Sequence, residues 1–165
     1  MINFKGFSSL EKLPEKLHIY TGVFLKEMER VALLDVFKPK HQNIYADHVT
    51  FWYKPDLDQV RFINKTNSPI TQEFAIQVTG YAEDEKAQAV SVKFPWIDFT
   101  GIVIKNELLH ITISCAEGTS PVYSNELLKN AVPYREGVVV VGQLGVCSHS
   151  DRTYLPQGIW KRRGL

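Results

Sequence analysis

Two short segments of the chain place a threonine two residues after a histidine. The first is His48-Val49-Thr50-Phe51 and the second is His110-Ile111-Thr112-Ile113. Both lie in runs rich in β-branched and aromatic residues, which favour β-strands. Because side chains alternate between the two faces of a strand, each histidine shares a face with its threonine. Each strand should therefore present an imidazole and a hydroxyl on one face and a set of apolar side chains to the core on the other.

Two histidines facing one pocket can share acid and base work. Imidazole titrates near pH 6.5, so one ring can be neutral while the other is protonated. In-line attack on a phosphodiester needs a base for the nucleophile and an acid for the leaving oxygen. Each threonine hydroxyl can donate to a non-bridging phosphate oxygen. A single His-x-Thr on a strand is usually structural, but two copies in similar strands favour catalysis.

The elements that must position these motifs predict an α+β fold with mostly antiparallel sheets. The repeated motif suggests two similar lobes that face each other across a groove. A helix over residues 26–37 should stop before Pro39, and residues 126–129 suggest a helical turn. We expect strands at 18–25, 43–54, 71–83, 87–94, 106–115 and 136–146, with a short strand compatible with residues 60–63.

The 165 residues suffice for one domain, with residues 1–17 as an N-terminal arm and residues 150–165 as a basic C-terminal tail. The formal net charge of +1 does not predict a polyanion-coating protein. No apolar run approaches the length of about 18–20 residues that spans a bilayer, and the start of the chain does not resemble a secretory signal. We therefore expect a monomer that does not bind membranes.

Cysteine and acidic residues predict neither a disulfide framework nor a metal site. Cys115 and Cys147 lie in apolar strand-like runs, as buried free thiols do. Free thiols indicate a reducing compartment, and we expect a cytoplasmic protein. The chain offers no Cys/His or acidic cluster with metal-ligand spacing, so we expect no metal and no cofactor.

The duplicated His-hydrophobic-Thr-hydrophobic pattern resembles the two-histidine phosphoesterase superfamily. Its members include bacterial RNA 2′,3′-cyclic phosphodiesterases, the myelin cyclic-nucleotide phosphodiesterase and the cyclic phosphodiesterase domain of plant and fungal tRNA ligases. The stretch after the second motif, with Gly118, Pro121 and Ser124-Asn125-Glu126-Leu127, is similar to the tRNA-ligase type. The resemblance spans residues 18–146 and is specific at the two motifs and this loop.

This resemblance implies a bilobal (LigT-like) fold in which two antiparallel sheets with pseudo-twofold symmetry line a cleft. It implies a phosphoric diester hydrolase that opens a 2′,3′-cyclic phosphate to a 2′-phosphate without a metal. His48 and His110 would be the acid–base pair, and Thr50 and Thr112 would bind the phosphate. We favour His110 as the base that activates water and His48 as the acid, although the sequence leaves this order open.

Further residues are candidates for substrate binding. Trp52 shares the predicted motif face and could stack a base or fill the cleft wall. Tyr20 and Tyr45 could face the cleft, although packing in the core or at the rim is favoured. Ser124 and Asn125 could contact substrate or cap the short helix that follows.

Three functions remain open. The first is a phosphodiesterase for cyclic-phosphate RNA ends or cyclic nucleotides, which fits the motifs best. The second keeps the site and degrades cyclic di- or oligonucleotide signals, as some phage members of the superfamily do. The third is a non-catalytic module that binds RNA ends, but a pure binder would not need two titratable histidines. The chain has no ligase or kinase module, so the substrate of the tRNA ligases does not carry over.

Overall fold

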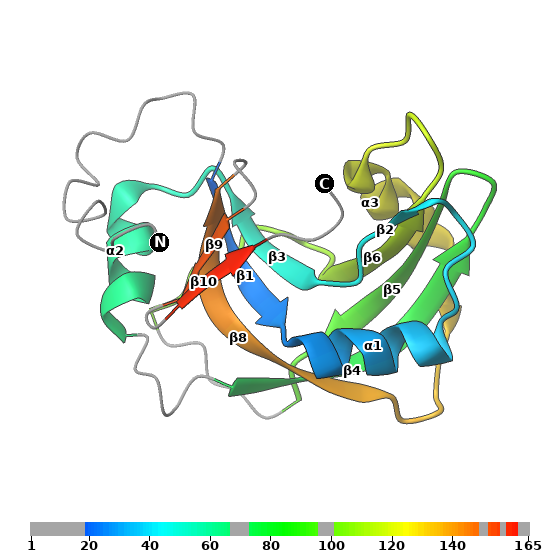
Figure 1. Ribbon diagram of the computed structural model, residues 1–165, viewed down its shortest axis with the longest axis horizontal. Helices are drawn as coiled ribbons and strands as arrows, with labels where there is room; N and C mark the ends of the chain where they lie inside the picture. Colours follow the sequence, from blue (N-terminus) through cyan, green and yellow to red (C-terminus); the bar gives the residue numbers. More distant parts are fainter. Residues whose placement is uncertain (1–18, 67–72, 96–100, 149–151, 156–157, 162–165) are drawn as a thin grey trace.

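A computed structural model describes residues 19–66, 73–95, 101–148, 152–155 and 158–161 of the chain (Figure 1). Within these ranges the protein is α+β, and every strand pairing is antiparallel, as predicted. The strands are β1 (Ile19–Leu25), β2 (Asn43–Ile44), β3 (His48–Tyr53), β4 (Glu73–Glu83), β5 (Ala87–Lys93), β6 (His110–Cys115), β7 (Val132–Pro133), β8 (Val139–Ser148), β9 (Arg152–Leu155) and β10 (Gly158–Lys161). The α-helices are α1 (Glu27–Val36), α2 (Leu57–Thr66) and α3 (Ser124–Leu127), and the 3-10 helices are η3 (Pro121–Tyr123) and η4 (Leu128–Asn130).

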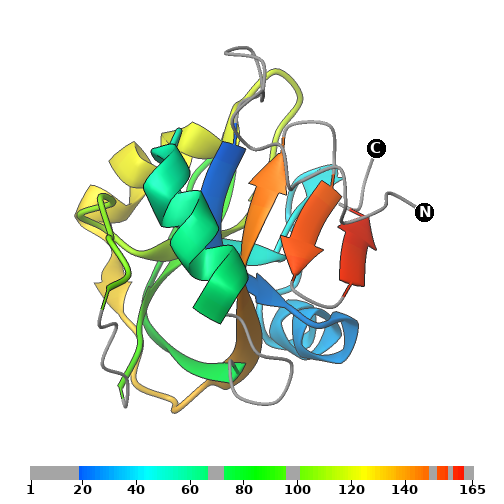
Figure 2. The same cartoon turned by 90° about the vertical axis from the view of Figure 1, so that its left-hand side faces the viewer.

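Strand β8 joins the two halves of the sheet. Its first residues pair with β4, and from there the sheet continues through β5 and β6 to β2. Its later residues pair with β1, which in turn pairs with β3. Helices α1 and α2 pack against β8, and α3 packs against β5 and β6 (Figure 2). By hydrogen bonding, the described strands therefore form one continuous sheet.

Residues 45–47, here called the 45–47 linker, bring the two motif strands together. The amide of Tyr45 donates to Ile113 O at 2.9 Å, and the amide of Ala46 donates to Thr112 O at 2.8 Å. On its other side, the Asp47 carbonyl accepts from the amide of Leu25 at 2.8 Å. The linker is thus bonded to β6 and to the end of β1 at once, so β3 lies against β6.

The core follows the alternation of apolar residues along the strands. Strand β4 alternates buried and less buried residues over most of its length, and Val49 and Phe51 of β3 are fully buried. Helix α1 has acidic residues in its first turn, which suits the helix dipole, and buries Leu33 in the core. The apolar faces of the sheet and helices thereby form one large cluster of buried side chains.

Residues 60–63 are helical, so the short strand considered for them is wrong. The Asp56 carboxylate accepts a hydrogen bond from the Gln59 amide at 2.8 Å, as an N-cap residue does. Val60 and Ile63 lie one turn apart on α2 and are both buried in the core. The N-cap and the helical spacing together make this segment the start of a helix.

The C-terminal region contributes two strands. The backbone of residues 152–155 and 158–161 forms β9 and β10, and β9 pairs with the last residues of β8. The predicted tail over 150–165 is corrected to this extent, and the predicted arm over 1–17 lies outside the described residues.

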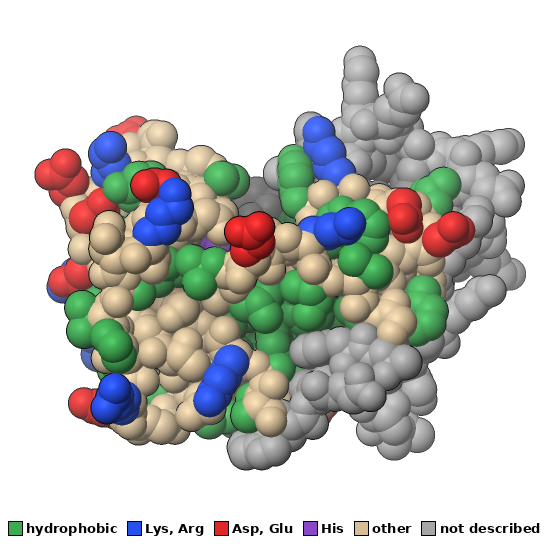
Figure 3. Space-filling view, turned by 180° about the vertical axis from the view of Figure 1, so that it is seen from behind, with side chains coloured by type: hydrophobic (Ala, Val, Ile, Leu, Met, Phe, Trp, Pro, Cys, Tyr) green, Lys and Arg blue, Asp and Glu red, His purple; other side chains and the backbone are tan. Residues whose placement is uncertain are grey.

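The surface and the thiols agree with the composition. Figure 3 shows acidic and basic side chains interspersed over one face rather than gathered by sign. Cys115 and Cys147 are buried free thiols, and burial raises the pKa of Cys115 to about 11. Among the helices that the structure describes, none is both long and apolar enough to cross a membrane.

Candidate active site

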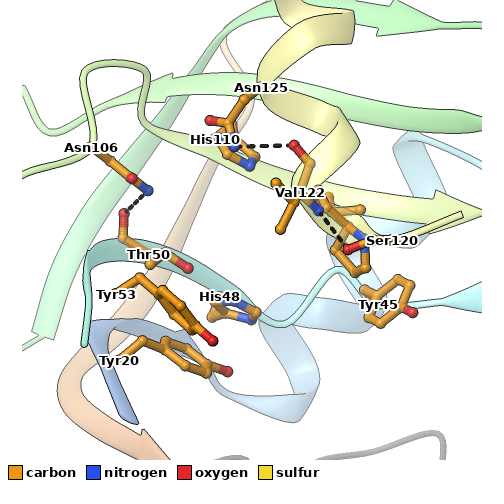
Figure 4. A pocket seen from close by; sticks show the side chains of 12 residues that line it. Tyr20, Tyr45, His48, Thr50, Tyr53, Asn106, His110, Ser120, Val122 and Asn125 are labelled. Carbon is orange, nitrogen blue, oxygen red and sulfur yellow. Dashed lines mark hydrogen bonds between the residues drawn. The ribbon is translucent and has the colours of Figure 1, made fainter. Parts of the chain in front are cut away.

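A cavity of about 340 Å³ lies between the two motif strands (Figure 4). This volume falls at the lower end of the range of about 300–1,000 Å³ that is typical of small-molecule sites. The histidine and threonine of each motif face this space, which we call the motif cavity. Its lining consists of Tyr20, Tyr45, His48, Thr50, Tyr53, Asn106, His110, Thr112, Ser120, Pro121, Val122 and Asn125.

His48 begins β3 and is held by the carboxylate before it. Its Nδ1 lies 2.7 Å from Oδ1 of Asp47, and both side chains are 17% exposed. An ionised carboxylate only accepts hydrogen bonds, so Nδ1 carries the proton and Nε2 is the nitrogen left for chemistry.

His110 begins β6 and has a neutral partner. Its Nδ1 donates to the Leu108 carbonyl at 2.9 Å, so Nε2 carries the lone pair of the neutral ring. Burial lowers the pKa of His110 below its ordinary value of 6.5, and the positive charge of His48 lowers it further, against the opposing effect of the Leu108 carbonyl. Both rings line the same cavity, so a charge on His48 acts on His110. His110 is therefore suited to be neutral near neutral pH.

The two threonines are positioned differently. Thr112 Oγ1 lies 2.8 Å from Oγ of Ser124, which is fully buried at the start of α3. Thr112 can also donate to the Pro121 carbonyl, but over 3.4 Å. When Ser124 donates to Thr112, the Thr112 proton is available to a ligand in the cavity. Ser124 thus lies behind Thr112 and does not line the cavity itself.

Thr50 is supported through its backbone by a residue that the sequence analysis did not select. Asn106 Nδ2 donates to the Thr50 carbonyl at 2.9 Å, and the Asn106 amide donates to the carbonyl of Phe51 at 3.0 Å. Asn106 lies shortly before the second motif and lines the cavity. Asn106 therefore connects the segment that leads into β6 to the backbone of β3.

Backbone strain occurs beside the motif. Ala46 has a φ of 57°, a conformation that non-glycine residues adopt rarely and at some cost. The hydrogen bonds of the 45–47 linker hold it there, and the next two residues are Asp47 and His48. This backbone turn directly precedes the carboxylate that contacts the His48 ring and the strand that carries the ring into the cavity lining.

Most predicted site residues meet at the motif cavity. His48, Thr50, His110 and Thr112 line it, as do Tyr45 and Asn125. Tyr20 also lines it, although its ring is almost fully buried. Additional lining residues come from β3, from the segment before β6 and from the segment after β6. These are Tyr53, Asn106, Ser120, Pro121 and Val122.

Trp52 does not line the cavity, and a β-bulge explains why. Thr50 pairs with Gly22 of β1, while Trp52 pairs with Thr21, so Phe51 is an extra residue on β3. A bulge of this kind reverses the faces of the residues that follow it. Tyr53, opposite Tyr20, therefore takes the cavity side that alternation had assigned to Trp52.

A structural finding and three comparisons with known proteins complete the description. Among the residues that the structure describes, no group of three or more His, Cys, Asp or Glu side chains could hold a metal ion. The chain matches no protein-family model, no curated protein and no solved structure.

Proposed function

We propose that the protein is a two-histidine phosphodiesterase that opens the 2′,3′-cyclic phosphate of an RNA end or a nucleotide to a 2′-phosphate. One observation carries this proposal. Two histidines face one cavity, and their Nδ1 atoms have different partners, a carboxylate for His48 and a backbone carbonyl for His110. This difference suits one ring to donate a proton and the other to accept one.

In the proposed reaction, His110 is the base. Its Nε2 takes a proton from a water molecule whose oxygen forms a new bond to phosphorus. The lowered pKa of His110 keeps the ring neutral and able to accept this proton near neutral pH.

His48 is the acid in the same step. The bond from phosphorus to the ribose 3′ oxygen breaks, and His48 Nε2 gives that oxygen its proton. The products are a 2′-phosphate and a 3′-hydroxyl. Asp47 supports this role because its carboxylate accepts a hydrogen bond from Nδ1 and leaves Nε2 for the transfer.

The two threonines stabilise the charge that develops on phosphate. Thr50 and Thr112 reach the cavity from opposite motif strands, so their hydroxyls can donate to the two non-bridging oxygens. Ser124 orients the second of these donors. These groups carry out the proposed reaction without a metal ion.

The arrangement of the strands supports two related lobes in the proposed fold. His48 pairs with Phe24 on β1, which pairs onward with β8, and His110 pairs with Ser91 on β5, which pairs onward with β4. Each motif thus begins the first strand of a series of three paired strands, β3–β1–β8 for His48 and β6–β5–β4 for His110. We propose that these two series are the pseudo-symmetric halves of a two-histidine phosphoesterase.

A substrate panel tests the proposal. It contains 2′,3′-cyclic mononucleotides, RNA with a cyclic-phosphate end, and cyclic di- and oligonucleotides, and the position of the product phosphate is determined by NMR. We expect hydrolysis of the 2′,3′-cyclic phosphates to 2′-phosphates, with no effect of EDTA. Hydrolysis confined to the cyclic di- or oligonucleotides would favour signal degradation, and binding without turnover would favour an RNA-end module.

Variants assign the chemistry to the motifs. We expect His48→Ala and His110→Ala each to abolish turnover, and Thr50→Ala or Thr112→Ala to lower kcat by about 10²-fold to 10³-fold, as for one oxyanion donor. His41→Ala is the matched control, because His41 lies outside the cavity lining. Turnover that persists in the double histidine variant contradicts the proposal.

A further inference from the structure

An aromatic wall extends from His48 along one side of the motif cavity. The ring of Tyr20 lies 4.9 Å from that of His48, measured between centroids, and Tyr20 pairs with Tyr53 across the two strands. Figure 4 shows the Tyr20 and Tyr53 rings beside each other below His48. Tyr20 is only 5% exposed, whereas Tyr53 is 48% exposed. The accessible part of this wall is therefore the ring of Tyr53.

An apolar side chain lies across the cavity from this wall. Val122 lines the cavity and is 71% exposed. Its amide donates to Ser120 Oγ at 3.3 Å, and its carbonyl accepts from Asn125 Nδ2 at 3.1 Å. The loop thus fixes Val122 at the cavity, where its side chain faces solvent rather than the core.

Two carboxamides add hydrogen-bonding capacity between these apolar groups. Asn106 and Asn125 each line the cavity, and each uses one N–H in the hydrogen bonds described above. A carboxamide has two N–H donors and an oxygen acceptor, so both side chains can also bond to a ligand. An aromatic face, an aliphatic side chain and nearby amides are the groups that bind an unpaired nucleobase.

The position of this wall agrees with the proposed roles of the histidines. The oxygen that leaves phosphorus belongs to the ribose, so the nucleoside must lie on the side of the acid. His48 is the proposed acid, and the aromatic wall extends from His48 rather than from His110. Water would then approach from the side of His110, opposite the leaving oxygen.

The geometry points to a nucleobase subsite in which the base of the cyclic-phosphate nucleoside stacks on Tyr53, with Val122 on the opposite side of the cavity. This inference rests on the proposed function and assigns the side chains that bind the base of its substrate. A cyclic phosphate without a base would have the chemistry but not the stacking, so it should bind more weakly.

The test compares two substrates in three variants. The substrates are adenosine 2′,3′-cyclic phosphate and 1-O-methylribose 2′,3′-cyclic phosphate, which lacks the base. We expect Tyr53→Ala to raise KM for the adenosine substrate about 10-fold or more, as loss of one stacking partner does, and to leave the base-free substrate unchanged. Tyr53→Phe should retain the wild-type KM. Trp52→Ala, on the other face of the same strand, is the control and should change neither KM, with folding checked by circular dichroism.

If Tyr53→Ala raises KM equally for both substrates, the proposed subsite is wrong. It is also wrong if Trp52→Ala, and not Tyr53→Ala, raises KM for the adenosine substrate alone. If the protein shows no turnover, calorimetric titration can still test the subsite. It measures the binding of adenosine 2′-phosphate and of 1-O-methylribose 2′-phosphate, which lacks the base. A preference for the adenosine ligand that disappears in Tyr53→Ala supports the subsite even where hydrolysis, and with it the proposed function, fails. Equal binding of the two ligands by the wild-type protein excludes it.

Discussion

Replacing Asp47 by asparagine removes one charge from the proposed acid and changes its shape very little. The asparagine oxygen can still accept the proton on His48 Nδ1 over the present 2.7 Å, so the ring keeps its position. The negative charge that accepts this hydrogen bond is lost. If His48 is the acid, this variant should weaken protonation of the leaving oxygen and little else.

The size of the effect follows from the kind of hydrogen bond that is lost. Both side chains are mostly buried, so solvent screens their interaction only in part. A hydrogen bond to a charged group contributes about 1.5–3 kcal/mol and a neutral one about 0.5–1.5 kcal/mol. The difference of about 1–2 kcal/mol corresponds to a loss of about 5-fold to 30-fold in kcat/KM.

The assay uses leaving groups that differ in their need for an acid. A ribose oxygen leaves as a poor, strongly basic alkoxide unless it is protonated, whereas p-nitrophenolate leaves without a proton. We expect Asp47→Asn to show the full loss with a 2′,3′-cyclic nucleotide and almost none with a p-nitrophenyl phosphodiester.

Two controls complete the assay. His110→Gln should lose activity on both substrates, because the water needs a base whichever group leaves. Asp35→Asn removes an exposed carboxylate that pairs with Lys38 and should change neither rate. An equal loss on both substrates in Asp47→Asn, or no loss on either, would refute the assignment of His48 as an acid supported by Asp47.

Further predictions concern the base, the second threonine and the bulge. The pKa of His110 is lowered from 6.5, so the neutral ring persists to more acidic pH than a free imidazole does. We therefore expect kcat/KM to decline only below pH 6.5. A decline that begins above pH 6.5 in the pH–rate profile contradicts this. In Ser124→Ala, Thr112 loses its partner Ser124 and donates its proton to the Pro121 carbonyl instead of to the phosphate. We expect kcat to fall by about 5-fold to 10-fold, the equivalent of one hydrogen bond, as measured by steady-state kinetics. Gly22→Ala should destabilise the protein by about 1–3 kcal/mol in thermal unfolding, because an added Cβ would overlap the Val49 carbonyl. Unchanged unfolding of Gly22→Ala would show that β1 and β3 can separate.

The sequence predicted the motif faces well where strands are regular. In the first part of β3 and in β6, apolar residues alternate with His and Thr, so the faces of His48, Thr50, His110 and Thr112 follow from alternation alone. Trp52 lies beyond the bulge, where two residues of β3 oppose one residue of β1. Gly22, in an otherwise β-branched and aromatic run, was the available signal, since a glycine inside a strand often marks a bulge.

Other parts of the site depend on contacts that are distant in sequence. Asp47 is adjacent to His48, but only the turn at Ala46 directs its carboxylate to the ring. Asn106 contributes through the Thr50 carbonyl, and no local pattern pairs these two positions. Helix α2, in contrast, was predictable from Asp56 and Gln59, which have the spacing of a capping box.

The 45–47 linker makes the spacing of the two histidines depend on main-chain length. Its hydrogen bonds hold β6 on one side and β1 on the other, so one residue more or less would shift both sets of bonds together. Side chains here can vary without changing that spacing, but the number of residues cannot. As related chains diverge, insertions and deletions should therefore collect in hairpin tips such as residues 84–86, and the length of this segment should stay constant.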